Sequence, residues 1–473
     1  MSETNVKQDR NIKLDKMLNL LVFASLCLFL LSPLIQIIRE AISPHKVTHF
    51  GVLYTYPFTI GTINYIVIFA VIVLWLTFAL RATRRKREGF QTKLFAPLVI
   101  FGILACWMYL SQTVNGFTSY AYVGESYRNE SLFSFILYVV GYFFFGTILK
   151  SERLRKTAVY LFLASQIVVG VLVLIDKYAV SLTVFNDTEG MSAIFHQFNH
   201  YGYYLVLGIL LSAALFVASG GKLILRILCA VLYILDNVIL ILNNTFGCYL
   251  AVIAALIFGM VVFALRRDRG ECIRMIIVIL AFVVITVVMR LMDYSNARDV
   301  TKLASDIGNI AEGNEKAQSA GPGRWALWKH TVEYIKEKPV FGWGVEGITD
   351  RLDSEPDTIN DRPHNEYLQW AAFFGIPAAL LYLAALCVVM FGMFPRLKRE
   401  GALSVACFIA SAGYIASAFF GNTMYYTAPF FFIFLGMCCH DRYYELHGEE
   451  VHKEAVSEEA REEAQIEVQE EVR

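Results

Sequence analysis

The chain has 473 residues, of which 57% are hydrophobic and only 17% are charged, and its mean hydropathy is +0.52. Soluble domains carry about 25% charged residues, so this composition predicts an integral membrane protein. The 41 basic and 41 acidic residues cancel to a net charge of zero, which excludes the overall basic field that nucleic-acid binding requires.

Apolar runs long enough to cross a bilayer recur along the chain. A transmembrane helix needs about 20 mostly apolar residues. Twelve runs approach this length, and the first has no A-x-A cleavage site, so we expect it to remain as the first span. We therefore expect an all-α, polytopic bundle of about 12 transmembrane helices. The runs cover residues 17–38, 59–80, 94–113, 131–149, 157–175, 201–219, 223–242, 246–265, 273–292, 366–394, 403–419 and 424–440.

Basic residues gather in alternate connections between these runs. One set of connections holds nineteen Lys and Arg, whereas the opposite short connections hold only Arg39, Lys46, Arg128 and Lys177. Basic loops are retained in the cytoplasm, which predicts a multi-pass protein of the plasma or inner membrane with both termini cytoplasmic.

This orientation divides the chain into five parts. Residues 1–16 form a cytoplasmic segment, and residues 17–292 hold the first nine spans. Residues 293–365 form one long external loop, residues 366–440 hold the last three spans, and residues 441–473 form an acidic cytoplasmic tail. A long loop is uncommon unless it has a function, so we expect the chemistry in residues 293–365.

Within the external loop, Arg324 opens a predicted helix that Pro339 ends. Arg324 lies in the first turn, where free N–H groups and the helix dipole favour an anion, and a guanidinium fits phosphate oxygens. The alternative is a solvated residue at the start of a structural lid. One face of this helix is apolar, which predicts that it lies on the outer membrane surface. That face holds Trp325, Trp328, Val332 and Ile335.

A second candidate lies just before the tenth run. Pro363 favours an extended approach and Asn365 is a natural helix N-cap, which leaves His364 at the external membrane boundary. An imidazole has an ordinary pKa of about 6.5, which suits proton abstraction near neutral pH. A purely structural histidine is the alternative.

Three other patterns carry less information. Residues 342–347 match G-x-G-x-x-G without the strand and helix of a dinucleotide site, so we interpret them as a tight turn. His196 and His200 have the spacing of zinc ligands but no third ligand is evident. Asp236, deep in a run, is either functional or satisfied by Asn237 or a neighbouring helix. The nine cysteines form no C-x-x-C pair and predict neither disulfides nor a thiolate metal site.

Several segments match a known pattern in their order and topology. Residues 323–328 (GRWALW) place an arginine at a helix start, and residues 338–344 (KPVFGWG) end that helix with a proline and glycine turn. Residues 364–378 read His-Asn, nine residues, then glycine, with alanine three positions later. These segments resemble the bacterial O-antigen ligase and polysaccharide polymerase superfamily, whose last position is Gly, Thr or Tyr. Residues 198–200 resemble its external Asn-containing turn, and residues 244–247 (NTFG) stand where many members carry Ser-Arg-Gly.

The resemblance implies a GT-C-like membrane glycosyltransferase acting at the external face. It would move a glycan from a polyprenyl-pyrophosphate carrier to an acceptor hydroxyl on a glycan, lipid or protein. His364 would be the base and Arg324 the main cation. No cofactor is implied, and we expect no divalent metal because arginines can replace it and the external loops lack a D-x-D motif. The further substrate-binding candidates are Arg362, Arg128, Asn199 and Asn365.

A lipid or polysaccharide transporter, or a flippase without catalysis, is the alternative. Twelve spans and Asp236 would also suit such a protein. Transporters usually have repeat-related halves and helices interrupted at the midplane, and the sequence has no sign of either. We therefore favour the enzyme, and leave open whether it is a ligase or a polymerase.

Overall fold

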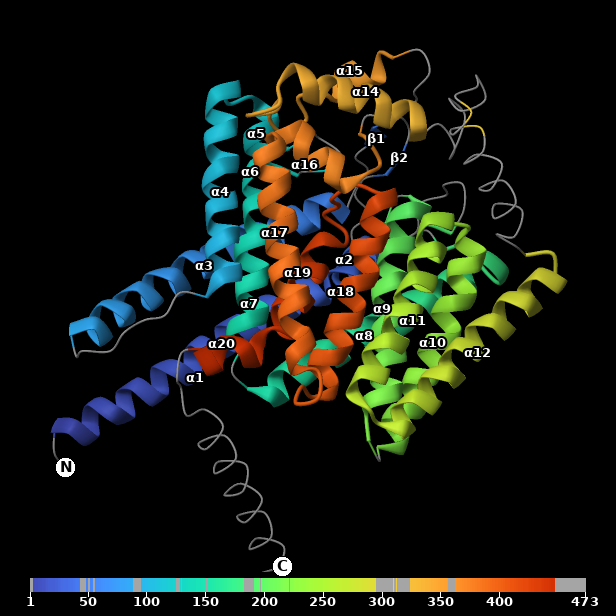
Figure 1. Cartoon of the computed structure of the whole chain (residues 1–473), viewed down its shortest axis with the longest axis horizontal. Coiled ribbons are helices and arrows are strands. Elements are labelled where there is room, and N and C mark those ends of the chain that lie inside the picture. Colours follow the sequence, from blue (N-terminus) through green and yellow to red (C-terminus); the bar gives the residue numbers. More distant parts are fainter. Residues whose placement is uncertain are drawn as a thin grey trace, which may run out of the picture.

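Long apolar helices make up most of the structure, a computed structural model (Figure 1). The expected all-α membrane bundle is confirmed, with one short two-stranded ladder added between β1 (Thr48–His49) and β2 (Val52–Leu53). The structure describes residues 3–42, 48–49, 52–53, 56–87, 95–124, 128, 130–149, 151–182, 191–195, 197–220, 222–294, 309, 312, 324–355 and 362–446.

Nine helices in the described part of the chain are long and apolar enough to cross a membrane. A tenth candidate is a pair of helices, α1 (Glu3–Leu30) and α2 (Ser32–Ile42), that bends by 60°. Pro33 explains the bend, because its ring removes a backbone donor. The nine helices are α3 (Tyr56–Arg87), α4 (Ala96–Asn115), α8 (Glu152–Tyr178), α9 (Phe198–Ala218), α10 (Leu223–Asn243), α11 (Phe246–Arg266), α12 (Arg269–Leu291), α17 (Ile376–Met393) and α18 (Ala402–Ser417).

The remaining apolar runs are helical but differ from the twelve single spans that we expected. The fourth run forms α6 (Leu132–Ile136), a π-helical segment η1 (Leu137–Tyr142) and α7 (Phe143–Ile148). The last run forms only α19 (Ala428–Cys438). The fourth and last runs are shorter than the spanning helices, so nine or ten of the helices described qualify as spans by length and composition.

The tenth run is divided by a glycine. Gly375 has φ +87°, a left-handed conformation that ends α16 (Glu366–Phe374) before α17 begins. The position is also crowded, because a Cβ on Gly375 would collide with the backbone of Val340. The predicted span 366–394 is therefore two helices, and only α17 is long enough to cross a membrane.

Helix α9 lies at the centre of the bundle. It packs against α8, α10, α11, α12 and α18, and 89% of its apolar window is buried, against 22% for α12 at the edge. A helix that is apolar all round is expected to be buried in this way. Elsewhere, Gly146 and Gly436 let α7 and α19 approach each other closely. A Cβ on either glycine would collide with the backbone of the other helix.

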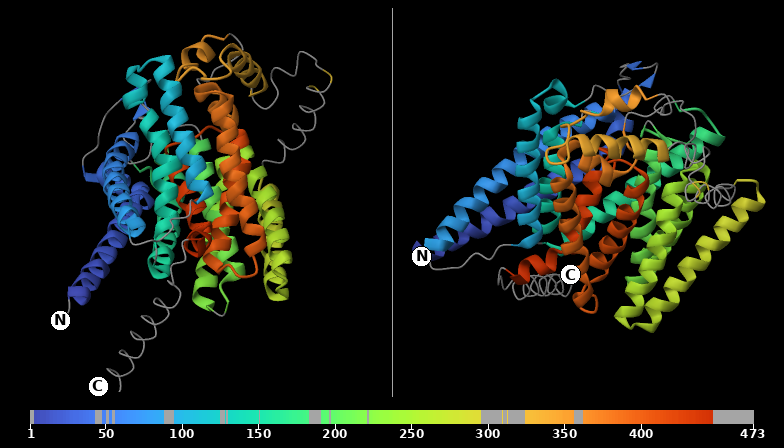
Figure 2. Two further views of the ribbon diagram at one scale, coloured as in Figure 1. Left: turned by 60° about the vertical axis from the view of Figure 1, so that its left-hand side comes forward. Right: turned by 45° about the horizontal axis from the view of Figure 1, so that its top comes forward.

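The helices of the long connection cover one end of the bundle. Figures 1 and 2 place α14 (Arg324–Glu337) and α15 (Thr349–Asp353) at the end opposite the start of α1 and the α17–α18 connection. The helix predicted at Arg324 is confirmed, and it packs on α16. Val332 is exposed, and the contact of the predicted apolar arc with the outer membrane surface stays a prediction. The buried residues are Ala326, Leu327, Thr331, Tyr334 and Ile335.

Short elements complete the described chain. They are α5 (Ser119–Val123), η3 (Phe394–Arg396), η4 (Ala418–Phe420) and α20 (His440–Leu446). Helix α1 includes residues 3–16, so the predicted N-terminal segment is continuous with the first apolar helix. Helix α20 includes the start of the predicted acidic tail, and residues 447–473 lie outside the described residues.

The side of the membrane that each end faces stays a prediction from the basic loops. We expect a topology reporter fused after Arg351 in α15 to be external and one fused after Gln91 to be cytoplasmic. Paired alkaline phosphatase and green fluorescent protein fusions would measure this. A cytoplasmic signal from the Arg351 fusion would contradict the orientation and remove the site from the external face.

Candidate functional site

The turn after α18 connects the segments that carry the two main candidates. Phe419 in η4 packs edge-on against Trp328 of α14, with 5.4 Å between ring centroids. Three residues later, the side-chain oxygen of Asn422 accepts a hydrogen bond of 2.8 Å from the backbone N–H of His364. The turn therefore contacts both the helix that Arg324 opens and the segment that ends in His364.

His364 is held in an uncommon backbone conformation. Its φ is +50°, in the left-handed region that few non-glycine residues adopt, and its side chain is half-buried. Such conformations persist only where surrounding structure fixes them. Asn422 fixes the residue on one side. On the other, buried Asn365 accepts a bond of 3.1 Å from the N–H of Leu368, which confirms the predicted N-cap of α16.

Arg324 is the first residue of α14 and is half-buried. Its charge acts on Tyr203 of α9 and Cys248 of α11, so its side chain lies near the ends of both helices. Among the residues that the structure describes, no carboxylate pairs with Arg324 and no group accepts a hydrogen bond from it. Arg324 can therefore accept an anionic ligand without losing a partner among the described residues.

Tyr203 shows that the two candidates lie at the same end of the bundle. It is near Arg324 on one side and near Glu366, the first residue of α16, on the other. Its hydroxyl also faces Gly421, where a Cβ would collide with it. Because Gly421 precedes the residue that binds the backbone of His364, Tyr203 lies between the Arg324 and His364 segments.

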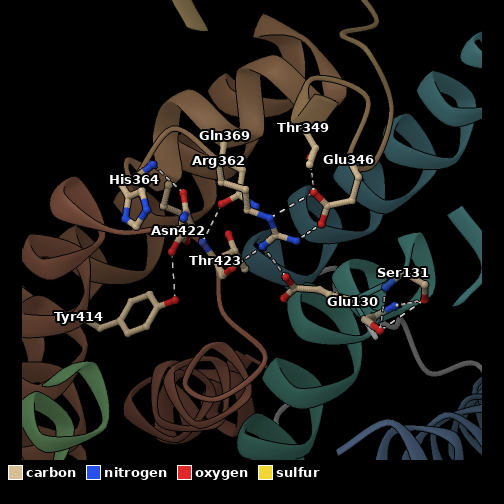
Figure 3. A network of polar contacts seen from close by, with 12 residues as sticks. Glu130, Ser131, Glu346, Thr349, Arg362, His364, Gln369, Tyr414, Asn422 and Thr423 are labelled. Carbon is tan, nitrogen blue, oxygen red and sulfur yellow. Dashed lines mark hydrogen bonds and ion pairs between the residues drawn. The ribbon is translucent and has the colours of Figure 1, made fainter. Parts of the chain in front are cut away.

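Arg362 lies in a buried network of charges (Figure 3). Its side chain is only 2% exposed. One terminal nitrogen, Nη1, donates to Glu130 at 2.7 Å and to the backbone oxygen of Thr423 at 3.3 Å. The other, Nη2, pairs with Glu346, and Nε donates to the same carboxylate at 3.3 Å. The guanidinium thus binds protein carboxylates, and its predicted contact with substrate stays a prediction.

Arg128 belongs to the edge of the same network. It is half-buried in the connection before α6, and its charge acts on Glu130 two residues later. Burial raises the pKa of Glu130, while the charges of Arg362 and Arg128 oppose that rise. Arg128 therefore helps to balance the network, and a substrate contact through it stays a prediction.

Glu366 is a third buried carboxylate beside the candidate base. The hydroxyl of Tyr382 in α17 donates to Oε1 at 2.5 Å, and the hydroxyl of Tyr414 in α18 donates to Oε2 at 3.0 Å. Burial raises the pKa of Glu366 to about 7, and the tyrosine bonds oppose the rise. Glu366 therefore titrates in the same range as an ordinary histidine.

The tight turn interpreted from the glycines is confirmed. Gly342 and Gly344 have φ values of +59° and +80°. The N–H groups of Trp343 and Gly344 donate to the carbonyl oxygens of Ala372 and Phe373 at 2.9 and 2.8 Å. These bonds attach the segment after α14 to the last turn of α16.

Comparison with known proteins finds a similar family for part of the chain. Residues 227–383 match the family model described as O-antigen ligase. This segment is therefore similar to an O-antigen ligase domain. The match supports membership of the O-antigen ligase superfamily, as the motifs predicted, and the domain includes Arg324, Arg362 and His364. A search of curated proteins finds no match to the chain.

Asn199 lies at the start of α9, outside the segment that the family model matches. It is half-buried, and the next residue, His200, has its Nδ1 3.1 Å from the backbone oxygen of Phe195. The ring of His200 also contacts that of Tyr426, at 4.9 Å between centroids. Asn199 is therefore near the residues that follow the α18 turn, and its substrate contact stays a prediction.

A metal site has no support in the described residues, where no group of three His, Cys, Asp or Glu could hold an ion. His196 lies outside those residues, so the His196/His200 pair is not described. All nine cysteines are free thiols. Asp236 is fully buried, and neither of its oxygens has a hydrogen-bond partner. Satisfaction by Asn237 is therefore wrong, because that side chain donates to Tyr233 instead.

Three buried acids at this end of the bundle were not predicted from the sequence. Glu130 and Glu346 pair with Arg362, and Glu366 follows His364 by two residues. Glu130 lies in a short connection beside Arg128, and an acid next to a candidate cation was the available signal. No sequence signal identified Asn422, because its partner is a backbone N–H.

We expect Arg362→Gln to destabilise the protein strongly. The change leaves Glu130 and Glu346 buried without their cation, and breaking a buried pair costs about 3–5 kcal/mol. The thermal midpoint of the detergent-solubilised protein would measure the loss. Lys336→Gln is the control, because its pair with Glu333 is exposed and should contribute almost nothing. Equal midpoints for the two variants would refute a structural role for Arg362.

Proposed function

We propose that the protein transfers a glycan from a polyprenyl-pyrophosphate carrier to an acceptor hydroxyl at the external face. The family match supports a membrane ligase or polymerase of the glycosyltransferase type. One observation carries the finer proposal: Arg324, which has no carboxylate partner among the described residues, lies at the same end of the bundle as His364 in its strained conformation. These are the cation and base that the reaction requires.

The reaction needs one proton transfer and one substitution at carbon. His364 takes the proton of the acceptor hydroxyl as the acceptor oxygen forms a bond with the anomeric carbon of the glycan. The bond between that carbon and the carrier phosphate breaks, and its electron pair stays on the departing oxygen. The carrier pyrophosphate therefore gains negative charge as the glycan leaves.

Arg324 is proposed to stabilise the charge on the carrier pyrophosphate. A guanidinium already paired with a carboxylate could bind phosphate only by giving up that partner. Arg362 is in this position, with Glu130 and Glu346 on either side, whereas Arg324 has no such partner in the described chain. The contrast between the two arginines supports Arg324 as the phosphate ligand. Arg128, Asn199 and Asn365 remain weaker candidates for contacts to substrate.

The transporter alternative has less support than the enzyme. The family match is to a ligase. Arg324 opens α14 and His364 comes just before α16, and Figure 1 shows these two helices toward one end of the bundle rather than at its middle. Neither observation distinguishes a ligase, which uses a lipid or protein acceptor, from a polymerase, which extends a second carrier-linked glycan.

We expect His364 and Arg324 to affect different steps. His364→Ala should lower turnover by about 10²–10⁴ and leave carrier binding nearly intact, because the base acts only while bonds change. Arg324→Ala should weaken binding and turnover together, because the pyrophosphate is anionic before and during the reaction. Carrier-glycan binding and turnover, measured side by side in folded protein, would test the division.

Two further variants are matched controls. His364→Asn removes the imidazole but tolerates a positive φ better than alanine, so a loss shared by both variants is due to the ring and not to backbone strain. Arg324→Lys keeps the charge without the planar fork and should restore only part of the function. Loss of carrier binding in His364→Ala with unchanged behaviour of Arg324→Ala would show that the roles are wrongly assigned.

We also expect transfer to be independent of divalent metal. Arg324 is proposed to stabilise the pyrophosphate charge that other enzymes stabilise with a divalent metal ion. Purified protein given carrier-linked glycan should therefore keep its activity in excess EDTA. Activity that is lost in EDTA and returns with magnesium or manganese would refute this expectation and direct attention to Asp353 and Glu355 in the external loop, together with Asp357.

A further inference from the structure

The surroundings of Glu366 are built to hold an ionised carboxylate. The side chain is fully buried at the start of α16, and each of its oxygens accepts a hydrogen bond from a different tyrosine. Those tyrosines come from two separate helices, α17 and α18. A carboxylate accepts bonds on both oxygens, whereas a neutral acid would have to donate from one of them. The two hydroxyl donors therefore match the charged form.

Glu366 nevertheless has no cation of its own among the described residues. The nearest buried arginine in the sequence, Arg362, is already bound by Glu130 and Glu346. Burying a charge without a partner of opposite sign is costly even where hydrogen bonds are present. The site therefore has room for a positive charge close to Glu366.

His364 is the group that can supply this positive charge. Two residues of chain span at most about 7 Å, so the backbones of His364 and Glu366 are close. Both are also held by the same part of α18 and its following turn, His364 by Asn422 and Glu366 by Tyr414. Figure 3 shows His364, Asn422 and Tyr414 on the same side of Arg362.

We infer that Glu366 is a positioning residue whose carboxylate stabilises the protonated imidazole of His364. The inference deepens the proposed function and rests on it for its catalytic meaning. In the reaction, the acceptor proton moves to the imidazole and stays there while the new bond forms, and the carboxylate of Glu366 takes no proton from the substrate. Its charge makes His364 a stronger base without any contact between Glu366 and substrate.

Other titratable groups surround Glu366. Tyr367 lies on its own helix, Tyr382 on α17, Tyr414 on α18 and Tyr203 on α9. Tyrosines ordinarily titrate near pH 10, far above the range of the test. Glu130 is the one other carboxyl whose charge acts on Glu366, and Arg362 binds it directly.

Chemical modification of His364 tests the inference without any enzyme assay. Diethyl pyrocarbonate reacts with the neutral imidazole, so the rate of modification against pH gives the midpoint for His364. Full-length protein in detergent would be modified between pH 5 and 8 and the His364 peptide quantified by mass spectrometry. We expect Glu366→Gln to lower this midpoint by about one pH unit, as a charge within about 8 Å would.

Three variants serve as controls for this measurement. Glu366→Asp keeps the charge, so its His364 midpoint should stay close to that of the unchanged protein. Tyr414→Phe removes one donor from the carboxylate and should lower the midpoint by less than Glu366→Gln, which provides a test if the latter does not fold. Glu400→Gln changes an equally buried acid beyond the far end of α17 and should leave the His364 midpoint unchanged.

The pH dependence of transfer separates this inference from the proposed function. If the proposed function and the role of Glu366 both hold, the acid limb of the kcat/KM profile in Glu366→Gln moves to lower pH. The shift equals that of the modification midpoint. A shifted midpoint in Glu366→Gln together with full activity in His364→Ala would refute His364 as the base. It would still support the electrostatic coupling of Glu366 and His364. An unchanged midpoint in Glu366→Gln, or an equal shift in Glu366→Asp or Glu400→Gln, would overturn the inference.

Discussion

The buried charge of Arg362 is the constraint on which the rest of the site depends. A guanidinium removed from water must be matched by acceptors, and here the acceptors come from the connection before α6, the turn before α15 and the turn after η4. Chain segments that share one ion in this way cannot move independently. His364 follows this fixed point by two residues, and Asn422, next to Thr423 of the network, holds its backbone in the left-handed conformation.

Hydropathy predicts most of the fold because the bilayer requires long apolar helices, and every apolar run is helical in the described chain. It fails where a local feature interrupts a run. Pro33 bends the first run, and Gly375 divides the tenth, since a left-handed glycine ends a helix whatever the hydropathy around it. Periodicity finds an apolar arc on α14, but only the packing on α16 shows which of its residues the protein itself covers.

The site could be predicted only in part, and the reason is distance along the chain. His364, Asn365 and Arg324 lie in local patterns with evident chemistry, a base before an N-cap and a cation at a helix start. Glu130 pairs with a residue 232 positions away, and no local pattern predicts such a pair. Phosphate binding predicts cations, so the acids that hold Arg362 and the acid that follows His364 carry no signal in a sequence that is compared with that chemistry.

The break at Gly375 has a consequence for how a lipid-borne substrate would meet the enzyme. Because α16 turns away from the line of α17, it lies beneath α14 instead of continuing along the span (Figure 1). At 1.5 Å per residue, the nine residues of α16 place its start about 14 Å from the top of α17. The isoprenoid tail of the proposed carrier would then stay among the lipid acyl chains while its pyrophosphate reached the end of the bundle that α14 covers. The carrier would not have to leave the membrane during a catalytic cycle.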